Sequence, residues 1–303
     1  MPNYAYYHKK YMPLNDTKIN VQTNFMHYGT GVFEGIRGNW NKTKKQIYLF
    51  RLTEHYQRLI NGCKVLKMKL PYTIEELNKM TVELVARSGL KEDCYVRPLA
   101  YKSSEALGVR LHNLEDDFLA FVIPWGPYLD TDTCRVGVSS WRRPGSNFSA
   151  PQCKLTGQYV NGAFAKTEAI ENGFDEAIML NESGHVAEGS GENIFLLIGG
   201  KLVTPGIYES ALIGITRNTV IELAKNELGL ETIERPIDRT ELYTAEEAFF
   251  TGTATHVAAI GEVDHRPVGD GQMGPVTKKL HDLYFDVIQG KKPKYMKWCT
   301  PVY

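Results

Sequence analysis

The sequence predicts an α+β protein with two domains. The chain has 303 residues, enough for two domains of roughly 100–200 residues each. Hydrophobic residues make up 43% of the chain, so it can build a sizeable core and is not a disordered protein. The strands that the sequence predicts do not alternate strictly with its helices, which argues against a doubly wound parallel sheet.

The first domain is expected over residues 1–124 and combines strands with two amphipathic helices. Residues 51–68 carry apolar side chains at helical spacing. Residues 73–90 open with a Thr-x-x-Glu capping box and close at a glycine, so they predict a second helix. Strands are expected at 94–103 and 117–126.

A connection between domains is expected at residues 125–133, because the stretch PWGPYLDTDT contains two prolines and a glycine. The second domain is expected over residues 134–303. It is predicted to begin with a strand at 134–141 and a helix after Lys154. Two hairpins follow at 175–189 and 193–205, and then a helix at 216–228. Two strands at 246–252 and 256–264 and a last helix at 275–288 complete it.

Charge and composition exclude several classes of function. Lysine plus arginine equals aspartate plus glutamate, at 35 each, so the chain has no electrostatic footprint for nucleic acid or an anionic membrane. The five cysteines form no CxxC pair and the eight histidines no HExxH motif, so we expect no metal site. The first residues lack the apolar core of a signal peptide, and no run approaches the ~18 apolar residues of a membrane span. These features predict a cytoplasmic protein that acts on small molecules.

The stretch GDGQMG, residues 269–274, matches the dinucleotide fingerprint GxGxxG letter for letter. That fingerprint needs a strand–helix–strand unit, whereas only one helix and an irregular tail follow here. A turn that leads into a helix with Pro275 at its first position explains the glycines better. A nucleotide-dependent oxidoreductase is therefore not expected.

Three other segments carry groups that suit a single cofactor. Lys154 lies in a short polar run, Glu188 lies in a glycine-rich segment, and GITR (214–217) opens a helix. Each has an ordinary alternative, namely a solvated lysine, a solvated glutamate and a plain helix N-cap. Together, however, an amine, a carboxylate and a phosphate-binding helix N-terminus are what pyridoxal 5′-phosphate requires.

The sequence resembles the branched-chain amino-acid aminotransferases, which are fold-type IV pyridoxal 5′-phosphate enzymes of the class IV aminotransferase family. The resemblance spans roughly residues 25–290. It implies the two-domain fold of the D-amino-acid aminotransferases, with the cofactor in the cleft between the domains. The motifs that carry it, in family order, are HYGTGVFEGIR, EHYQRL, YVRPL, PWGPYL, SSWRR, CKLTGQYVN, EGSGENIF, GITR, FFTGTA and GPVTKKL.

Carried over position by position, the resemblance implies that Lys154 forms a Schiff base with the cofactor and moves the Cα proton of the substrate. The residues that would bind the cofactor are Arg58, Tyr159, Glu188, Ile215, Thr216 and Thr253. Those that would bind the substrate are Tyr28, Phe33, Tyr95, Arg97, Val109, Trp125, Tyr128 and Ala254. Val109 resembles a residue lent to the neighbouring subunit's site, which implies a homodimer or a higher even homo-oligomer.

The activity implied is ping-pong transamination of leucine, isoleucine and valine with 2-oxoglutarate. One departure concerns the loop that shapes the substrate entrance, where Arg110–Leu111–His112 stand in place of the Asn–Pro of many members. A transaminase for D-amino acids or (R)-primary amines, or an aminodeoxychorismate lyase, therefore stays open as an alternative. A protein that binds pyridoxal 5′-phosphate without turnover is a more remote alternative, because mere binding needs neither Lys154 nor Glu188.

Overall fold

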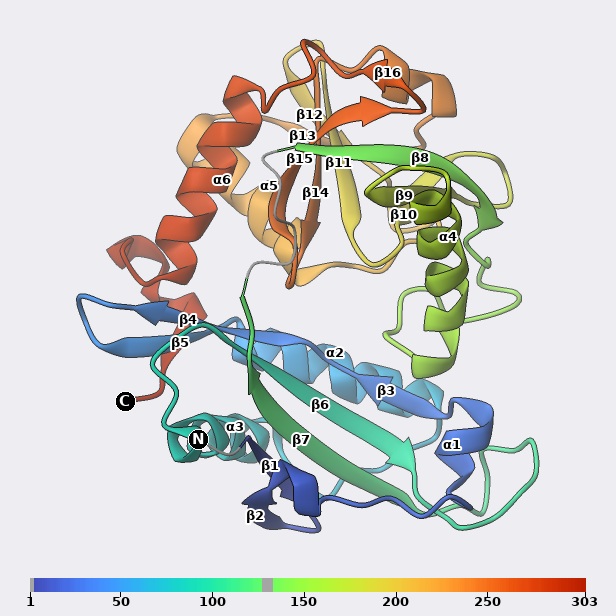
Figure 1. Ribbon diagram of the computed structural model, residues 1–303, viewed down its shortest axis with the longest axis vertical. Helices are drawn as coiled ribbons and strands as arrows, with labels where there is room; N and C mark the ends of the chain where they lie inside the picture. The colour runs from blue at the N-terminus through green and yellow to red at the C-terminus, as the bar shows by residue number, and fades with distance from the viewer. Residues whose placement is uncertain (1–2, 127–132) are drawn as a thin grey trace. The chain divides into compact units, whose positions relative to one another are not determined.

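The computed structural model describes residues 3–126 and 133–303, which divide into two compact units (Figure 1). Each unit has its own sheet and its own hydrophobic core. Of the described residues, unit 1 comprises 3–126, 153–157 and 286–303, and unit 2 comprises 133–152 and 158–285.

Unit 1 is built on an antiparallel sheet covered by two helices. Its elements are β1 (Tyr4–Tyr7), β2 (Lys10–Pro13), α1 (Asn24–Tyr28), β3 (Gly31–Phe33), β4 (Ile36–Asn41), β5 (Gln46–Phe50), α2 (Leu52–Val65), α3 (Ile74–Ser88), β6 (Cys94–Lys102), β7 (Asp116–Pro124) and β17 (Cys299–Pro301). The strand order is β17-β5-β4-β6-β7-β1-β2, and β3 pairs with β6. Helices α2 and α3 pack against each other and against this sheet.

The two helices of unit 1 form for the reasons that the sequence predicts. Tyr56, Leu59 and Cys63 recur at helical spacing on α2 and are buried in the core. At the start of α3, Thr73 Oγ1 accepts from the Glu76 amide at 3.2 Å, and Glu76 Oε2 accepts from the Thr73 amide at 2.8 Å. The predicted capping box is therefore confirmed.

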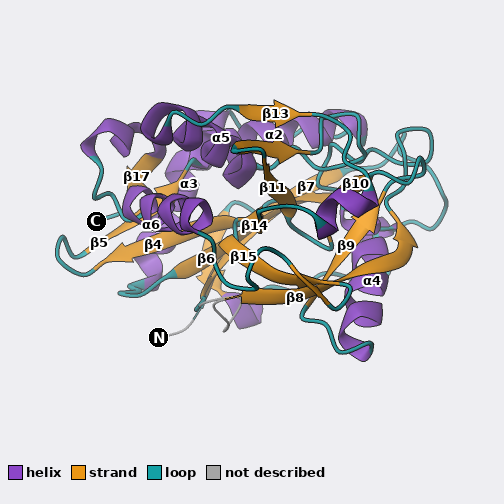
Figure 2. Cartoon of the chain, turned by 90° about the horizontal axis from the view of Figure 1, so that it is seen from above, coloured by secondary structure: helices purple, strands orange, loops and turns teal. Residues whose placement is uncertain are grey.

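Unit 2 is built on a mixed sheet (Figure 2). Its elements are β8 (Thr133–Arg142), α4 (Tyr159–Glu171), β9 (Glu176–Leu180), β10 (Val186–Gly189), β11 (Asn193–Ile198), β12 (Lys201–Thr204), α5 (Ile215–Leu228), β13 (Thr232–Glu234), β14 (Glu247–Gly252), β15 (His256–Val263), β16 (Arg266–Pro267) and α6 (Pro275–Ile288). The strand order is β10-β9-β8-β15-β14-β11-β12-β13, and β8 runs parallel to both of its neighbours. The α+β class is confirmed.

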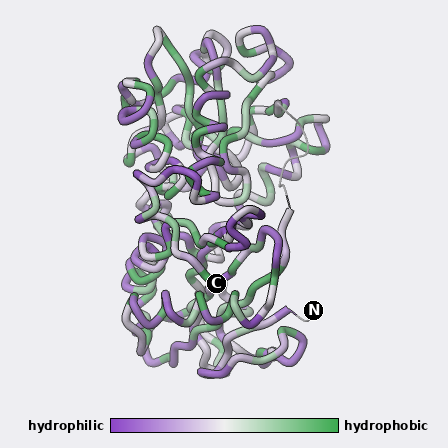
Figure 3. The backbone as a smooth tube through the Cα atoms, turned by 90° about the vertical axis from the view of Figure 1, so that its left-hand side faces the viewer, coloured by the Kyte–Doolittle hydropathy of each residue, from purple (hydrophilic) through white to green (hydrophobic). Residues whose placement is uncertain are grey.

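Both predicted hairpins of unit 2 are present. β9 pairs antiparallel with β10, and β11 pairs antiparallel with β12. The second hairpin closes through Gly199 and Gly200, whose φ angles are +57° and +71°. Glycine adopts positive φ angles without the steric cost that other residues carry, so the pair suits this two-residue turn. Figure 3 shows that hydrophobic and hydrophilic stretches alternate along the chain in both units.

The glycine pattern at residues 269–274 forms a turn, and α6 begins directly after it at Pro275. This confirms the interpretation of the pattern as a turn before a helix. Among residues 3–126 and 133–303, no helix is long and apolar enough to cross a membrane. Within the same residues, no group of three His, Cys, Asp or Glu side chains could hold a metal ion.

Two segments lie in a different unit from the domain in which the sequence predicts them. Residues 153–157 and 286–303, expected in the second domain, pack within unit 1. The reason is strand pairing, since Leu155 forms a bridge with Val32 and β17 pairs with β5. Most of the connection expected at 125–133 lies outside the described residues.

Candidate active site

Lys154 is held in unit 1 by contacts of its main chain. Its carbonyl oxygen accepts a hydrogen bond from the Phe33 amide at 3.1 Å. Two residues further on, Thr156 Oγ1 donates to the carbonyl oxygens of Gly29 and Gly31 at 2.7 and 3.2 Å. The Lys154 amine lies 4.9 Å from the centre of the Phe33 ring, and the residue is half-buried. The alternative of a solvated surface lysine is therefore wrong for Lys154.

Glu34 lies at the centre of a buried ionic network in unit 1. Its Oε1 accepts from Arg58 Nε at 2.6 Å and its Oε2 from the Arg58 terminal nitrogen at 2.8 Å. His55 Nδ1 lies 2.7 Å from the same Oε2. Burial by itself raises the pKa of Glu34, but Arg58 and His55 outweigh it and hold that pKa well below its usual value. The fork of two hydrogen bonds fixes the plane of the Arg58 guanidinium.

His55 belongs to this network as a neutral donor. Burial lowers the pKa of His55, although the carboxylate of Glu34 opposes the shift. Since Glu34 is ionised and accepts only, His55 Nδ1 donates the hydrogen bond. The Arg58 side chain is only 14% exposed. The spacing of His55 and Arg58, three residues apart on one helix, is the signal that could have revealed their common partner.

Replacing Glu34 by glutamine is expected to lower the free energy of unfolding by about 3–5 kcal/mol, because Arg58 would lose its carboxylate in a mostly buried place. The folded-state pKa of Glu34 is depressed, so its stabilisation is complete above the unfolded value of 4.5 and is lost as the pH falls below it. Urea unfolding at pH 7 and at pH 4 measures this. The difference between wild type and variant should be smaller at pH 4.

The matched control is Glu54→Gln, on α2, the helix that carries His55 and Arg58. Glu54 pairs with Arg51 at 3.1 Å, but its side chain is 43% exposed. This variant should lose less than about 1 kcal/mol at either pH. Equal losses in the two variants would show that the Glu34 network contributes no more than a surface ion pair.

Four of the expected substrate residues come together in unit 1. The Arg97 guanidinium carbon lies 4.7 Å from the centre of the Phe33 ring and 5.2 Å from that of Tyr95. Arg97 also donates to the Tyr95 hydroxyl at 3.1 Å, and the rings of Tyr95 and Trp125 lie 5.3 Å apart. A cation among aromatic rings offers a charge for a carboxylate and apolar surface for an aliphatic group.

Tyr28 and Val109 belong to a second cluster in the same unit. The Tyr28 hydroxyl accepts from the Gly108 amide at 2.8 Å, and Asn24 Nδ2 donates to the Gly108 carbonyl oxygen at 3.2 Å. The next residue, Val109, is 89% exposed. Tyr128 lies outside the described residues.

Glu188 is buried in unit 2 and is held by three donors. Its Oε1 lies 2.8 Å from an Arg143 terminal nitrogen. Its Oε2 accepts from Asn193 Nδ2 at 3.2 Å and from the Leu212 amide at 3.0 Å. The solvated alternative for Glu188 is therefore wrong. Arg143, which the sequence did not single out, supplies the compensating charge.

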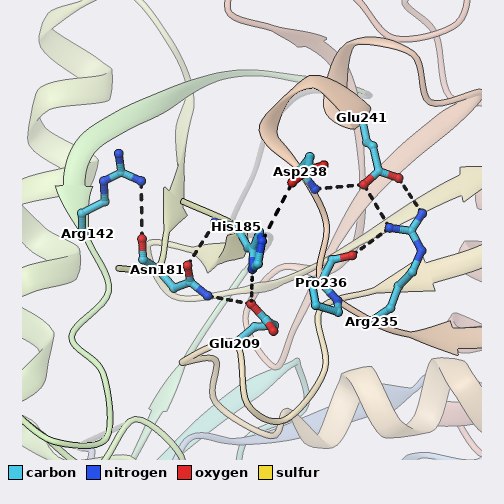
Figure 4. A network of polar contacts seen from close by, with 8 residues as sticks. All are labelled: Arg142, Asn181, His185, Glu209, Arg235, Pro236, Asp238 and Glu241. Carbon is cyan, nitrogen blue, oxygen red and sulfur yellow. Dashed lines mark hydrogen bonds and ion pairs between the residues drawn. The ribbon is translucent and has the colours of Figure 1, made fainter. Parts of the chain in front are cut away.

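The segment that leads to Leu212 is itself anchored by a polar network (Figure 4). Glu209 Oε2 accepts from Asn181 Nδ2 at 2.6 Å and lies 3.2 Å from His185 Nδ1. Asn181 Oδ1 in turn accepts from the His185 amide at 3.0 Å. These bonds tie the loop before α5 to the β9–β10 hairpin and so support the Leu212 amide that binds Glu188.

Ile215 and Thr216 lie in the first turn of α5. The N-cap residue is Gly214, which has no side chain to occupy the amides of that turn. A Cβ at Gly214 would lie 1.9 Å from Asn193 Oδ1, so the glycine is required by packing. Thr216 is buried, with its hydroxyl 3.4 Å from that of Tyr284. The helix therefore presents main-chain donors and a partial positive charge at this end.

Thr253 and Ala254 lie in the three-residue loop between β14 and β15, and pairing of Gly252 with His256 closes the loop. Tyr159 is the first residue of α4. The expected residues of unit 2 thus lie at the ends of strands and at helix N-termini, where main-chain amides are available to an anion.

Comparison with known proteins gives consistent results. The amino-transferase class IV family matches residues 31–263. A probable branched-chain-amino-acid aminotransferase of Aquifex aeolicus is 47% identical over 302 residues, covering 99% of this chain and 97% of that protein. The crystal structure of a branched-chain aminotransferase from Thermoproteus uzoniensis with norvaline has a TM-score of 0.96 and 42% identity, and all of both chains is covered.

A second crystal structure is of a form that holds the cofactor. The branched-chain amino acid aminotransferase from Thermobaculum terrenum in its pyridoxal 5′-phosphate form has a TM-score of 0.95 and 35% identity, covering 100% of this chain and 99% of that one. The similarity therefore extends over nearly the whole chain.

Proposed function

The chain belongs to the class IV aminotransferases, and we propose that it transfers the amino group of L-leucine, L-isoleucine or L-valine to 2-oxoglutarate. It is a transaminase that depends on pyridoxal 5′-phosphate. The products are a branched 2-oxo acid and L-glutamate. The observation that carries the substrate class is Arg97 beside the rings of Phe33 and Tyr95. A branched aliphatic side chain needs dry apolar surface, and the distal carboxylate of 2-oxoglutarate needs a cation.

The cofactor, when bound, supplies an electron-withdrawing ring that weakens the Cα–H bond of the amino acid. The Lys154 amine would hold the cofactor at its aldehyde and, once the amino group of the substrate has displaced it there, would act as the base that moves the Cα proton. The Glu188 carboxylate would bind the pyridine nitrogen and keep it protonated. Buried and held by three donors, Glu188 fits this role. Arg58, with its plane fixed by Glu34, binds the phosphate.

The remaining residues bind and orient. The main-chain groups of Ile215 and Thr216, together with Thr253, bind the cofactor phosphate, because the first turn of α5 has no capping side chain. Tyr159 donates to the phenolic oxygen of the cofactor. Around the substrate, the amides at Thr253–Ala254 bind a carboxylate. The apolar pocket is formed by the side chains of Tyr28, Phe33, Tyr95 and Trp125, and Val109 is lent to the site of the neighbouring subunit. Tyr128, expected in the same pocket, lies outside the described residues.

We propose a homodimer or a higher even homo-oligomer in the cytoplasm. The loop of Val109 supports the assembly, since Val109 and Leu107 are 89% and 67% exposed and an apolar loop tip of this kind suits contact with a second copy. The balanced charge, 35 basic against 35 acidic residues, supports the location, since it provides no attraction to an anionic membrane.

The first experiment is the visible spectrum of the purified protein before and after addition of L-leucine. We expect a yellow protein that L-leucine bleaches and that 2-oxoglutarate then restores. D-Leucine and an (R)-primary amine are the matched controls and should leave the colour unchanged. A yellow protein that responds to these controls but not to L-leucine would replace the proposed substrate class by the alternative one. A protein that stays colourless with added pyridoxal 5′-phosphate would overturn the proposed function.

A further inference from the structure

Glu192 is the second glutamate of EGSGENIF, and the proposed function gives it no role. It is 5% exposed and directly precedes β11. Its Oε2 accepts from the Gly191 amide at 3.0 Å, and its Oε1 accepts from Thr255 Oγ1 at 3.1 Å. One buried carboxyl group therefore joins the turn before β11 to the loop between β14 and β15.

The sheet register brings these two loops together. Asn193, the first residue of β11, pairs with Thr251 near the end of β14, so both loops leave the sheet at one edge. The packing around the carboxyl group is close. A Cβ at Gly189 would lie 2.9 Å from Glu192 Oε2, and a Cβ at Gly252 would lie 3.4 Å from Glu192 Cγ. Glu192 is thus confined to a position from which it reaches Thr255.

A carboxyl group is costly to bury at this position. Burial, together with the charge of Glu176, raises the pKa of Glu192 to about 7. The amine of Lys166 forms its ion pair with Glu176, at 2.6 Å. An apolar residue would avoid this cost but could not accept the Thr255 hydroxyl and the Gly191 amide. We therefore expect Glu192 to act by accepting the hydrogen bond of the Thr255 hydroxyl.

We propose that Glu192 is a positioning residue that acts through Thr255 on the main-chain amides of Thr253 and Ala254. This inference rests on the proposed function, in which those amides bind the cofactor phosphate and a substrate carboxylate. Strand pairing of Gly252 with His256 fixes the two ends of the loop. The hydrogen bond of the Thr255 hydroxyl fixes the loop between these ends. The amides are then preorganised for an anion, and less conformational entropy of the loop is lost on binding.

The test compares two probes that differ only in the phosphate, pyridoxal 5′-phosphate and pyridoxal. Full-length protein freed of cofactor is titrated with each of the two probes, and binding is measured by the change in absorbance. For Thr255→Val we expect a Kd for pyridoxal 5′-phosphate that is raised about 10-fold, with the Kd for pyridoxal changed less than about 2-fold. Thr255→Ser keeps the hydroxyl and should stay within about 2-fold of wild type for both. Glu192→Gln replaces one acceptor by a donor and should act in the same direction as Thr255→Val.

The control for a merely structural effect is Thr204→Val. Thr204 is also buried in unit 2, and its hydroxyl donates to the Ile194 carbonyl oxygen at 2.7 Å. This variant should lower Tm and leave the ratio of the two Kd values unchanged. If Thr255→Val and Glu192→Gln lower Tm but keep that ratio, or weaken both probes equally, the positioning role is wrong. Wild-type protein that binds neither probe would instead remove the proposed function.

Discussion

Replacing Lys154 by alanine is expected to reduce kcat for the transamination of L-leucine by about 10³–10⁴-fold or more, because one side chain supplies both the amine that bonds the cofactor and the base that moves the proton. Alanine leaves the backbone contacts in place. The hydrogen bond from Phe33 and those of Thr156 involve main-chain or other side-chain atoms, so the fold of unit 1 should persist. Stopped-flow absorbance with L-leucine measures the first turnover, and Tm measures folding.

The matched control for Lys154→Ala is Lys201→Ala. Lys201 forms an exposed pair with Glu231 at 2.9 Å in unit 2, and neither residue has a role in the proposed site. We expect wild-type rates from this control and a Tm change too small to measure. Turnover by Lys154→Ala at a rate near that of the control would refute the assignment of the catalytic amine.

The elements that the sequence predicted well are those whose signals are local. The stripe of Tyr56, Leu59 and Cys63, the Thr73–Glu76 capping box and the Gly199–Gly200 turn each act within a few residues, and the structure contains all three. Local patterns of this kind decide helix and hairpin formation without knowledge of the tertiary fold.

The partners of the site residues could not be predicted in the same way. Glu34 lies 24 residues from Arg58, and Arg143 lies 45 positions before Glu188. An isolated arginine or glutamate in a sequence is most often solvated, and only the tertiary packing shows which charges are buried together. For the same reason, residues 153–157 were expected in the second domain, since the bridge between Leu155 and Val32 spans more than a hundred residues.

Glu188→Gln is expected to lower kcat by about 10²–10³-fold, because a neutral amide cannot stabilise the charge on the pyridine nitrogen. The same change has a structural consequence that must be separated from the chemical one. Arg143 is buried and pairs with Glu188 at 2.8 Å, so the single variant leaves a buried guanidinium without its carboxylate. Unfolding should cost about 3–5 kcal/mol less than in wild type.

The double variant Glu188→Gln, Arg143→Met separates the two effects. Removing both charges avoids the uncompensated guanidinium, so the free energy of unfolding should recover most of its loss. The rate should not recover, because the side chain at position 188 is still neutral. Rates and urea unfolding measured on the same preparations decide between two roles. If the rate returns together with stability, Glu188 acts by holding Arg143 and unit 2 in place. If stability returns alone, the carboxylate acts on the cofactor ring.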